Sequence, residues 1–180
     1  MIRPMRFIST LALAAILAAC GSSTPDATGA PAAASTTQGR FALSFAVERA
    51  TVGREEAIAA AATLTLLAPG GATFSGSNTL VGFEFAEVGG KGRHVVPVSD
   101  DVCAPHRLTT KTPVVVPIAK SGAVVEGPDA DWYRSFLTDP LVHLPAGDWD
   151  ITALAQFHDG QACTGQKIDM RVTVRVHVTE

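Results

Sequence analysis

The last segment of the chain alternates between apolar and polar side chains without a break from Ile168 to Thr179. Because successive side chains of a β-strand point to opposite faces, this pattern predicts a long strand with one face on a core and one in solvent. Residues 149–158 alternate in the same way, and Asp159-Gly160 follows them as a turn signal. We therefore predict that the two segments form an antiparallel hairpin.

The register of this hairpin separates two of the histidines. If Phe157 pairs near Ile168, then His177 lies near Asp148. At about 3.3 Å per residue, His177 is then roughly 30 Å from His158. The two rings could not bind one metal ion within a single copy of the chain.

Further short strands are predicted along the rest of the body. Residues 41–47 alternate large and small side chains, and residues 80–85 form another apolar run. Residues 93–98 and 113–118 each contain proline, which indicates edge strands or bulges. Residues 50–68 are ambiguous: residues 54–62 are good helix formers, whereas residues 63–67 prefer a strand, so the choice between helix and strand stays open for 54–62. Seven to eight strands with at most one or two short helices predict an all-β, antiparallel β-sandwich.

The segment from Leu144 to Ile151 adds a family resemblance. It reads Leu-Pro-Ala-Gly-Asp-Trp-Asp-Ile and resembles the turn-and-strand entry of immunoglobulin-like and transthyretin-like bacterial domains. The resemblance implies an immunoglobulin-like fold, with proline and glycine at the corner and the aromatic side chain in the core. It implies no activity, because such folds carry many functions.

The N-terminus has the organisation of an export signal. Arg3 and Arg6 precede an apolar stretch over residues 7–17, which is shorter than the about 20 residues that span a bilayer and suits a signal peptide. Leu17-Ala18-Ala19-Cys20 resembles the lipobox of bacterial lipoproteins. The resemblance implies cleavage before Cys20 and attachment of a diacylglyceryl group, with palmitate-type chains, to its sulfur. The alternative is an ordinary secretory signal with an incidental cysteine.

These features predict a location and a domain division. We expect a signal peptide over residues 1–19, a lipidated cysteine and flexible tether over 20–40, and a single domain over 41–180. The tether is expected because residues 21–39 are almost wholly Ser, Thr, Ala, Gly and Pro. The protein would be anchored at the extracytoplasmic side of the cell envelope. Gly21 after the lipidated cysteine, where Asp would signal retention at the inner membrane, favours the outer membrane of a host with two.

Cys103 and Cys163 remain in the exported body. Two thiols in an oxidising compartment most often pair, so we predict a disulfide between them, which would stabilise the fold by roughly 3–4 kcal/mol. The alternative is a metal site, because Cys103 and His106 have a C-x-x-H spacing that Cys163 or another histidine could complete. No second paired ligand motif accompanies it, so we favour the disulfide and expect no cofactor.

Residues 126–139 concentrate acidic and aromatic side chains. One interpretation is a helical turn capped by Asp129 or Asp131, with Trp132 and other apolar side chains packed inward. The other is a recognition loop, because Trp, Tyr and Arg are favoured at interfaces. The candidate partner contacts are Trp132, Tyr133 and Arg134.

Composition and motifs then narrow the function. A net charge of −3, from 17 acidic and 14 basic side chains, argues against nucleic acid as a partner. Ser75 and Ser121 lack the G-x-S-x-G context of a hydrolase nucleophile, and Asp100-Asp101 has the character of solvated charge. We predict a membrane-anchored, non-catalytic binding or structural module for a protein, glycan or small ligand. A metal-binding module at Cys103, His106 and Cys163 is the alternative, and a hydrolase is the third hypothesis.

Overall fold

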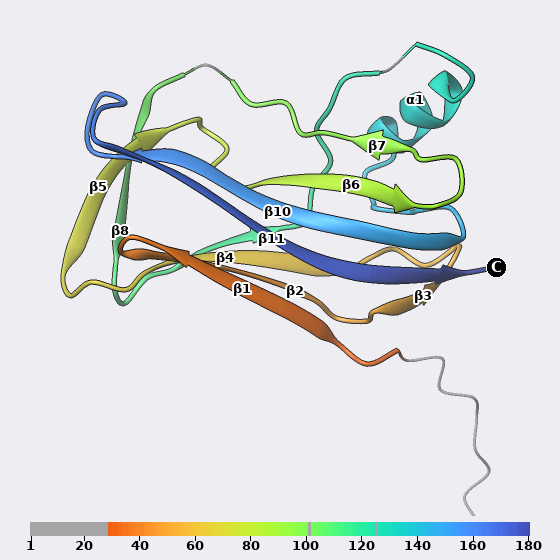
Figure 1. The fold of residues 1–180 in the computed structure, drawn as a ribbon, viewed down its shortest axis with the longest axis horizontal. Helices are drawn as coiled ribbons and strands as arrows, with labels where there is room; N and C mark the ends of the chain where they lie inside the picture. Colours follow the sequence, from red (N-terminus) through yellow and green to blue (C-terminus); the bar gives the residue numbers. More distant parts are fainter. Residues whose placement is uncertain (1–28, 101, 125) are drawn as a thin grey trace, which may run out of the picture.

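The computed structural model describes residues 29–100, 102–124 and 126–180, which form eleven strands and one helix (Figure 1). The expectation of an all-β chain with at most one or two short helices is confirmed. Seven to eight strands were predicted, and the excess comes from short or weakly patterned strands. In chain order the elements are β1 (Ala32–Gln38), β2 (Phe41–Val47), β3 (Thr51–Gly53), β4 (Ala60–Leu66), β5 (Gly71–Gly76), β6 (Gly82–Val88), β7 (His94–Val95), β8 (Ala104–Thr109), β9 (Val114–Pro117), α1 (Ala130–Thr138), β10 (Gly147–Asp159) and β11 (Gln166–Thr179).

The strands form two sheets. One has four strands in the order β1-β2-β4-β9, and the other has seven, with β3-β11-β10-β5-β8 in line, β6 beside β10, and β7 beside β6. All pairs are antiparallel except β3, which runs parallel to β11. The prediction of purely antiparallel strands is therefore wrong at β3, whose three residues are too few to show a pattern in the sequence.

The β10–β11 hairpin has the predicted register. Phe157 pairs with Ile168, and Asp148 pairs with His177, as the alternation requires. The ring Nδ1 of His177 lies 2.8 Å from a carboxylate oxygen of Asp148 on the solvent face. The long hairpin is the centre of the larger sheet, because β3 joins one side of it and β5 and β6 join the other.

The inward side chains of both sheets belong to one buried cluster. Phe41 of β2 makes an edge-on contact with Phe157 of β10, with ring centroids 4.8 Å apart, and a second with Phe74 of β5 at 5.7 Å. Phe45 of β2 meets Phe83 of β6 at 5.7 Å. Alternation on β2, β10 and β11 therefore fills a single core between the sheets.

The structure corrects the predicted tether. Ala32–Gln38 forms strand β1, which pairs with β2 over its whole length. Ala32 and Ala34 pack against the core, and Ala33 and Ser35 face outward. Small residues on both faces give no contrast in polarity, so composition alone misread this strand as flexible. The signal peptide, Cys20 and the rest of the predicted tether up to residue 28 lie outside the described residues.

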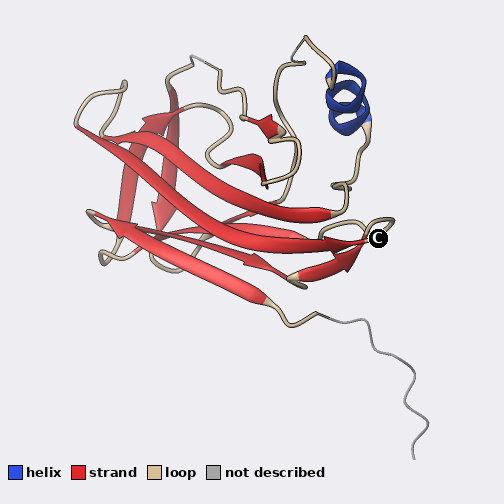
Figure 2. Cartoon of the chain, turned by 45° about the vertical axis from the view of Figure 1, so that its right-hand side comes forward, coloured by secondary structure: helices blue, strands red, loops and turns tan. Residues whose placement is uncertain are grey.

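The structure also decides the predictions for the ambiguous segment, the proline-containing segments, and the acidic and aromatic segment. Residues 54–59 form a turn and loop, and β4 begins at Ala60, so the ambiguous segment contains no helix. The proline-containing segments lie at edges: β9 ends the four-stranded sheet, and β7 pairs only with β6. The acidic and aromatic segment forms helix α1, which lies beside β6 and β7, away from the four-stranded sheet (Figure 2).

Candidate functional site

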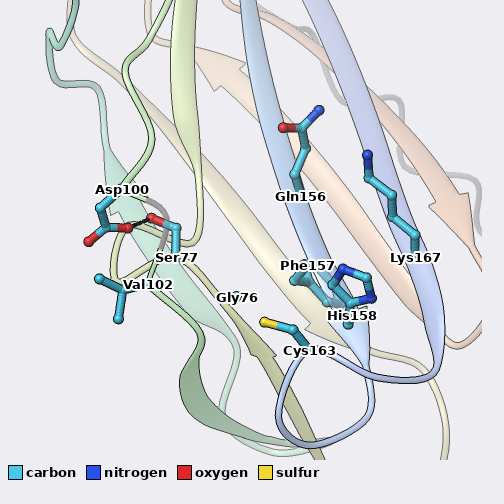
Figure 3. Close-up of a pocket in the computed structure, with 9 residues that line it drawn as sticks. All are labelled: Gly76, Ser77, Asp100, Val102, Gln156, Phe157, His158, Cys163 and Lys167. Atoms are coloured by element: carbon cyan, nitrogen blue, oxygen red, sulfur yellow. Dashed lines mark hydrogen bonds between the residues drawn. The ribbon is translucent and has the colours of Figure 1, made fainter.

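A cavity of about 200 Å³ opens to solvent beside the predicted cysteine pair. It lies where β5 ends, where the chain approaches β8, and where β10 turns into β11. Figure 3 shows the Ser77–Asp100 pair on one side, His158 and Lys167 on the other, and Cys163 between them. The lining residues are Gly76, Ser77, Asp100, Val102, Gln156, Phe157, His158, Cys163 and Lys167.

The sulfur atoms of Cys103 and Cys163 lie 2.09 Å apart, at disulfide distance, in agreement with the predicted pairing. The pair connects the segment before β8 to the β10–β11 loop across 60 residues of sequence. Ser75, which is fully buried, supports this loop: its hydroxyl donates to the Gly160 carbonyl and accepts from the Cys163 amide, both at 2.7 Å. Ser75 therefore positions the backbone around Cys163.

Asp100 forms the acidic wall of the cavity. Its carboxylate accepts hydrogen bonds from the Ser77 hydroxyl, from the Asn78 side-chain amide at 2.8 Å and from the Asn78 main-chain N–H at 3.2 Å. The hydrogen bond from Ser77, followed by that from the Asn78 side chain, holds the pKa of Asp100 below its ordinary value. The carboxylate is therefore ionised at neutral pH and fixed in orientation.

His158 and Lys167 form the opposite wall. They are direct partners in the register of β10 and β11. The Nδ1 atom of His158 is buried, and it is the one buried side-chain nitrogen or oxygen among the described residues that lacks a hydrogen-bond partner. The cavity is thus lined by a carboxylate on one side and by a histidine and a lysine side chain on the other.

The hydroxyl groups here are engaged in structural contacts. Ser77 donates to Asp100, and Ser75 donates to a main-chain carbonyl. His106, which stacks on Phe74 with centroids 5.4 Å apart, places its Nε2 2.9 Å from the Ser77 carbonyl oxygen. A serine nucleophile is commonly activated by a hydrogen bond from its hydroxyl to a histidine. The hydroxyl of Ser75 donates to a main-chain carbonyl instead, and that of Ser77 donates to a carboxylate.

The alternative metal site meets an obstacle in the same geometry. A zinc site would need Cys103 and Cys163 as separate thiolates, but their sulfur atoms are at bonding distance. His106 is directed to the Ser77 carbonyl. Across residues 29–100, 102–124 and 126–180, the structure holds no group of three or more His, Cys, Asp or Glu side chains placed to bind a metal ion.

The candidate contact residues lie on α1, far along the fold from this cavity. Tyr133 is buried, and its hydroxyl accepts from the His94 amide at 3.1 Å and donates to the His94 carbonyl at 3.2 Å. Trp132 is half-buried and stacks on Trp149, with ring centroids 5.8 Å apart. Arg134 is exposed and pairs with Asp131 at 2.7 Å.

The structure of this segment therefore agrees with the interpretation of residues 126–139 as a helical turn whose apolar side chains pack inward. Asp129 occupies its N-cap position, although its side chain makes no capping hydrogen bond. The register of the helix turns the ring of Tyr133 into the core. Of the three candidates, Arg134 alone is fully on the surface.

Sequence reasoning missed the grouping of Ser77, Asp100, His158 and Lys167. The hairpin register already implied that His158 and Lys167 are neighbours, because they follow Phe157 and precede Ile168. Asp100 carried no such signal, because its approach to Ser77 depends on the path of the loop between β7 and β8. Its interpretation as a solvated charge overlooked three hydrogen bonds.

Within the described residues, no helical segment has the length and apolar character needed to cross a membrane. In comparisons with known proteins, no family model matches the chain, and no curated protein matches it either.

Proposed function

We propose that this chain is a lipid-anchored module of the cell envelope, whose immunoglobulin-like β-sandwich body binds or supports a partner without catalysis. The observation that carries the proposal is the pairing of Cys103 with Cys163. Disulfides persist in oxidising compartments outside the cytoplasm. With that pair accounted for, Cys20 is the remaining cysteine, and it stands in the lipobox-like tetrad Leu17-Ala18-Ala19-Cys20.

The position of β1 limits how far the body could stand from the bilayer. Eleven residues lie between Cys20 and Ala32, the first residue of β1. Fully extended, they would reach about 40 Å. An anchored body would therefore stay within roughly its own diameter of the membrane, and in a host with two membranes we propose the outer one.

The contacts around the cavity support a binding or structural role. Ser75 and Ser77 use their hydroxyls to hold the β10–β11 loop and Asp100. A small polar ligand is the class that a cavity of about 200 Å³ with these walls would accept.

Metabolic labelling with a palmitate analogue tests the anchor. The full chain should become labelled and stay with the membrane fraction, and a Cys20→Ala variant should lose both properties. Cys163→Ala is the matched control, because it removes a cysteine that is not in the lipobox-like tetrad. An unlabelled full chain, or a labelled Cys20→Ala variant, would contradict the proposal.

A further inference from the structure

Both cysteines of the Cys103–Cys163 pair lie on loops at the surface instead of in the core. Cys103 is exposed and directly precedes β8, and Cys163 is half-buried near the tip of the β10–β11 loop. Cys163 also lines the cavity of about 200 Å³ that opens to solvent (Figure 3). A disulfide in such a position can be attacked by an external thiolate while the protein stays folded.

The backbone at Cys163 has a conformation that side chains disfavour. Ala162 has a φ of 51°, and Cys163 has a φ of 53°. At every other described position with a positive φ the chain carries glycine, including Gly165 in the same loop. In this left-handed region a Cβ atom comes too close to the following carbonyl oxygen, so both residues are strained. Among the described residues, this kind of backbone strain is therefore concentrated at one end of the disulfide.

The strained turn is held by a few hydrogen bonds and by the disulfide. The amide and the hydroxyl of Thr164 donate to the Gln161 carbonyl, at 3.1 Å and 2.6 Å. The Cys163 amide donates to the Ser75 hydroxyl at 2.7 Å. Gln161, Ala162 and Thr164 are exposed, so water competes for the hydrogen bonds of this tip. A strained conformation persists only where its surroundings enforce it, and the covalent bond is the strongest restraint here.

We propose that the Cys103–Cys163 disulfide is a thiol-exchange site that a dithiol reduces in the folded protein. A thiolate of the dithiol attacks Sγ of Cys103, the more exposed cysteine, and bonds to it as the Sγ–Sγ bond breaks. Cys163 leaves with the electron pair as a thiolate and takes up a proton from water. The second thiolate of the dithiol then attacks the reductant sulfur bound to Cys103, which forms the oxidised dithiol and releases Cys103 to be protonated in turn. Two electrons and two protons pass from the dithiol to the protein.

Reduction releases the turn and one wall of the cavity together. Without the bond, Ala162 and Cys163 can leave the left-handed region. The segment between β7 and β8 loses its covalent link to the β10–β11 loop and keeps the hydrogen bond between Asp100 and Ser77. Val102 of that segment and Cys163 of that loop both line the cavity. The redox state of the pair therefore controls the shape of the cavity.

Reduction kinetics of the full chain test the exchange. With dithiothreitol, the rate should rise in proportion to the dithiol concentration while far-UV circular dichroism stays unchanged. Alkylation followed by mass spectrometry of peptides measures the rate and distinguishes the pair from Cys20. A rate that levels off at the rate of global unfolding would overturn the proposal, because reduction would then require the unfolded chain. With the monothiol glutathione, acid quenching should trap the mixed disulfide on Cys103, and a mixed disulfide on Cys163 would overturn the assigned point of attack.

A glycine at position 162 tests the role of the strained turn. Ala162→Gly removes the Cβ clash from the oxidised form, so the equilibrium in a dithiol–disulfide buffer should shift about fivefold toward the oxidised protein. Ala119→Gly is the matched control, because Ala119 is an exposed loop residue without a positive φ, and it should leave the equilibrium unchanged. An unchanged equilibrium in Ala162→Gly, or equal shifts in both variants, would overturn the proposal.

The exchange site and the lipid anchor can fail separately. A chain that takes up palmitate but resists the dithiol while folded leaves the anchor standing. An unlabelled chain that is reduced in the folded state leaves the exchange site standing. The bond also keeps its stabilising effect against unfolding, because that effect arises chiefly in the unfolded chain.

Discussion

Arg93 lies between a carboxylate and two indole rings. Its guanidinium donates to Glu87 from Nε at 3.0 Å and from Nη2 at 2.8 Å, and it stands over the rings of Trp132 at 5.0 Å and Trp149 at 5.4 Å. The two charged side chains are only 11% and 5% exposed. The hydrogen bonds from Arg93 lower the pKa of Glu87 despite its burial. This ion pair joins β6 to the residue directly before β7.

Glu87→Gln is expected to destabilise the protein at neutral pH by about 2 kcal/mol or more, because it leaves Arg93 nearly buried without its counter-charge. The pKa of Glu87 is lower in the folded than in the unfolded chain. Its stabilising contribution is therefore complete above the unfolded value, about 4.3, and is lost as the pH falls through the folded value. Urea unfolding at pH 7 and at several acidic pH values should show a smaller loss of stability on acidification in the variant. Glu55→Gln is the control, because that side chain is 95% exposed, and equal acid slopes in Glu87→Gln and wild type would contradict the prediction.

The Cys103–Cys163 pair allows a second prediction at the residue scale. It closes a 60-residue separation, so its loss is expected to lower the free energy of unfolding by about 4 kcal/mol, chiefly through the larger entropy of the unfolded chain. The Cys103→Ser, Cys163→Ser double variant, compared with wild type in urea with and without a dithiol reductant, measures this. Reductant should destabilise the wild type and leave the double variant unchanged. An equal response of both proteins would show that the pair is not oxidised.

At the scale of elements, β1 shows how a strand can form without a polarity pattern. Its sequence, Ala-Ala-Ala-Ser-Thr-Thr-Gln, has small residues on both faces. Pairing with β2 supplies its hydrogen bonds, and the Gln38 side chain adds two more to β11, to the Lys167 carbonyl at 3.4 Å and from the Asp169 amide at 2.8 Å. β1 is therefore hydrogen-bonded to one strand of each sheet, although its amino-acid composition does not predict a strand.

Neighbouring alanines of β1 should respond differently to the same substitution. Ala34→Asp places a carboxylate against the core and is expected to cost several kcal/mol, about 3 or more, whereas Ala33→Asp faces solvent and should change stability by less than about 0.5 kcal/mol. Urea unfolding of both variants at low protein concentration makes the comparison. If residues 32–38 were a flexible tether, the two variants would be equally stable.

At the scale of the whole molecule, the two sheets share one core. Phe41 touches aromatic side chains of β5 and β10, so neither sheet can open without exposing rings of the other. The outer face of β10 and β11 carries ion pairs such as that of Asp150 with Arg175, whereas the outward residues of β1 and β2 are Ala, Ser and Thr. The molecule therefore has one cooperative interior and two chemically distinct exteriors.

Unfolding should follow a single transition. Far-UV circular dichroism and tryptophan fluorescence are expected to give the same midpoint in urea. Amide hydrogen exchange tests the same cooperativity separately in each sheet. Phe41→Ala should lower the free energy of unfolding by about 3–5 kcal/mol, and it should reduce amide protection in β10 and β11 as much as in β2. Loss of protection confined to the four-stranded sheet would show that the two sheets unfold separately.

The sequence by itself determined the parts of this protein whose pattern is local. Period-two alternation specified β2, the β10–β11 hairpin and its register, because a shift by one residue would turn every apolar side chain to solvent. Proline indicated edge strands or bulges for residues 93–98 and 113–118, because it has no N–H to donate to a neighbouring strand. In the structure β7 and β9 lie at edges. The cysteine count and the lipobox-like tetrad predicted a pair and an anchor.

Only the tertiary structure decided what depends on contacts between distant segments. It ordered the small residues of β1 as a strand, since β2 supplies their partners. It brought Asp100 to Ser77 and Asn78, across more than twenty residues of loop and strand. It also aligned β1, β2, β4 and β9 so that their outward, uncharged positions share one face. Each of these results depends on strand order and loop path, which a one-dimensional pattern does not encode.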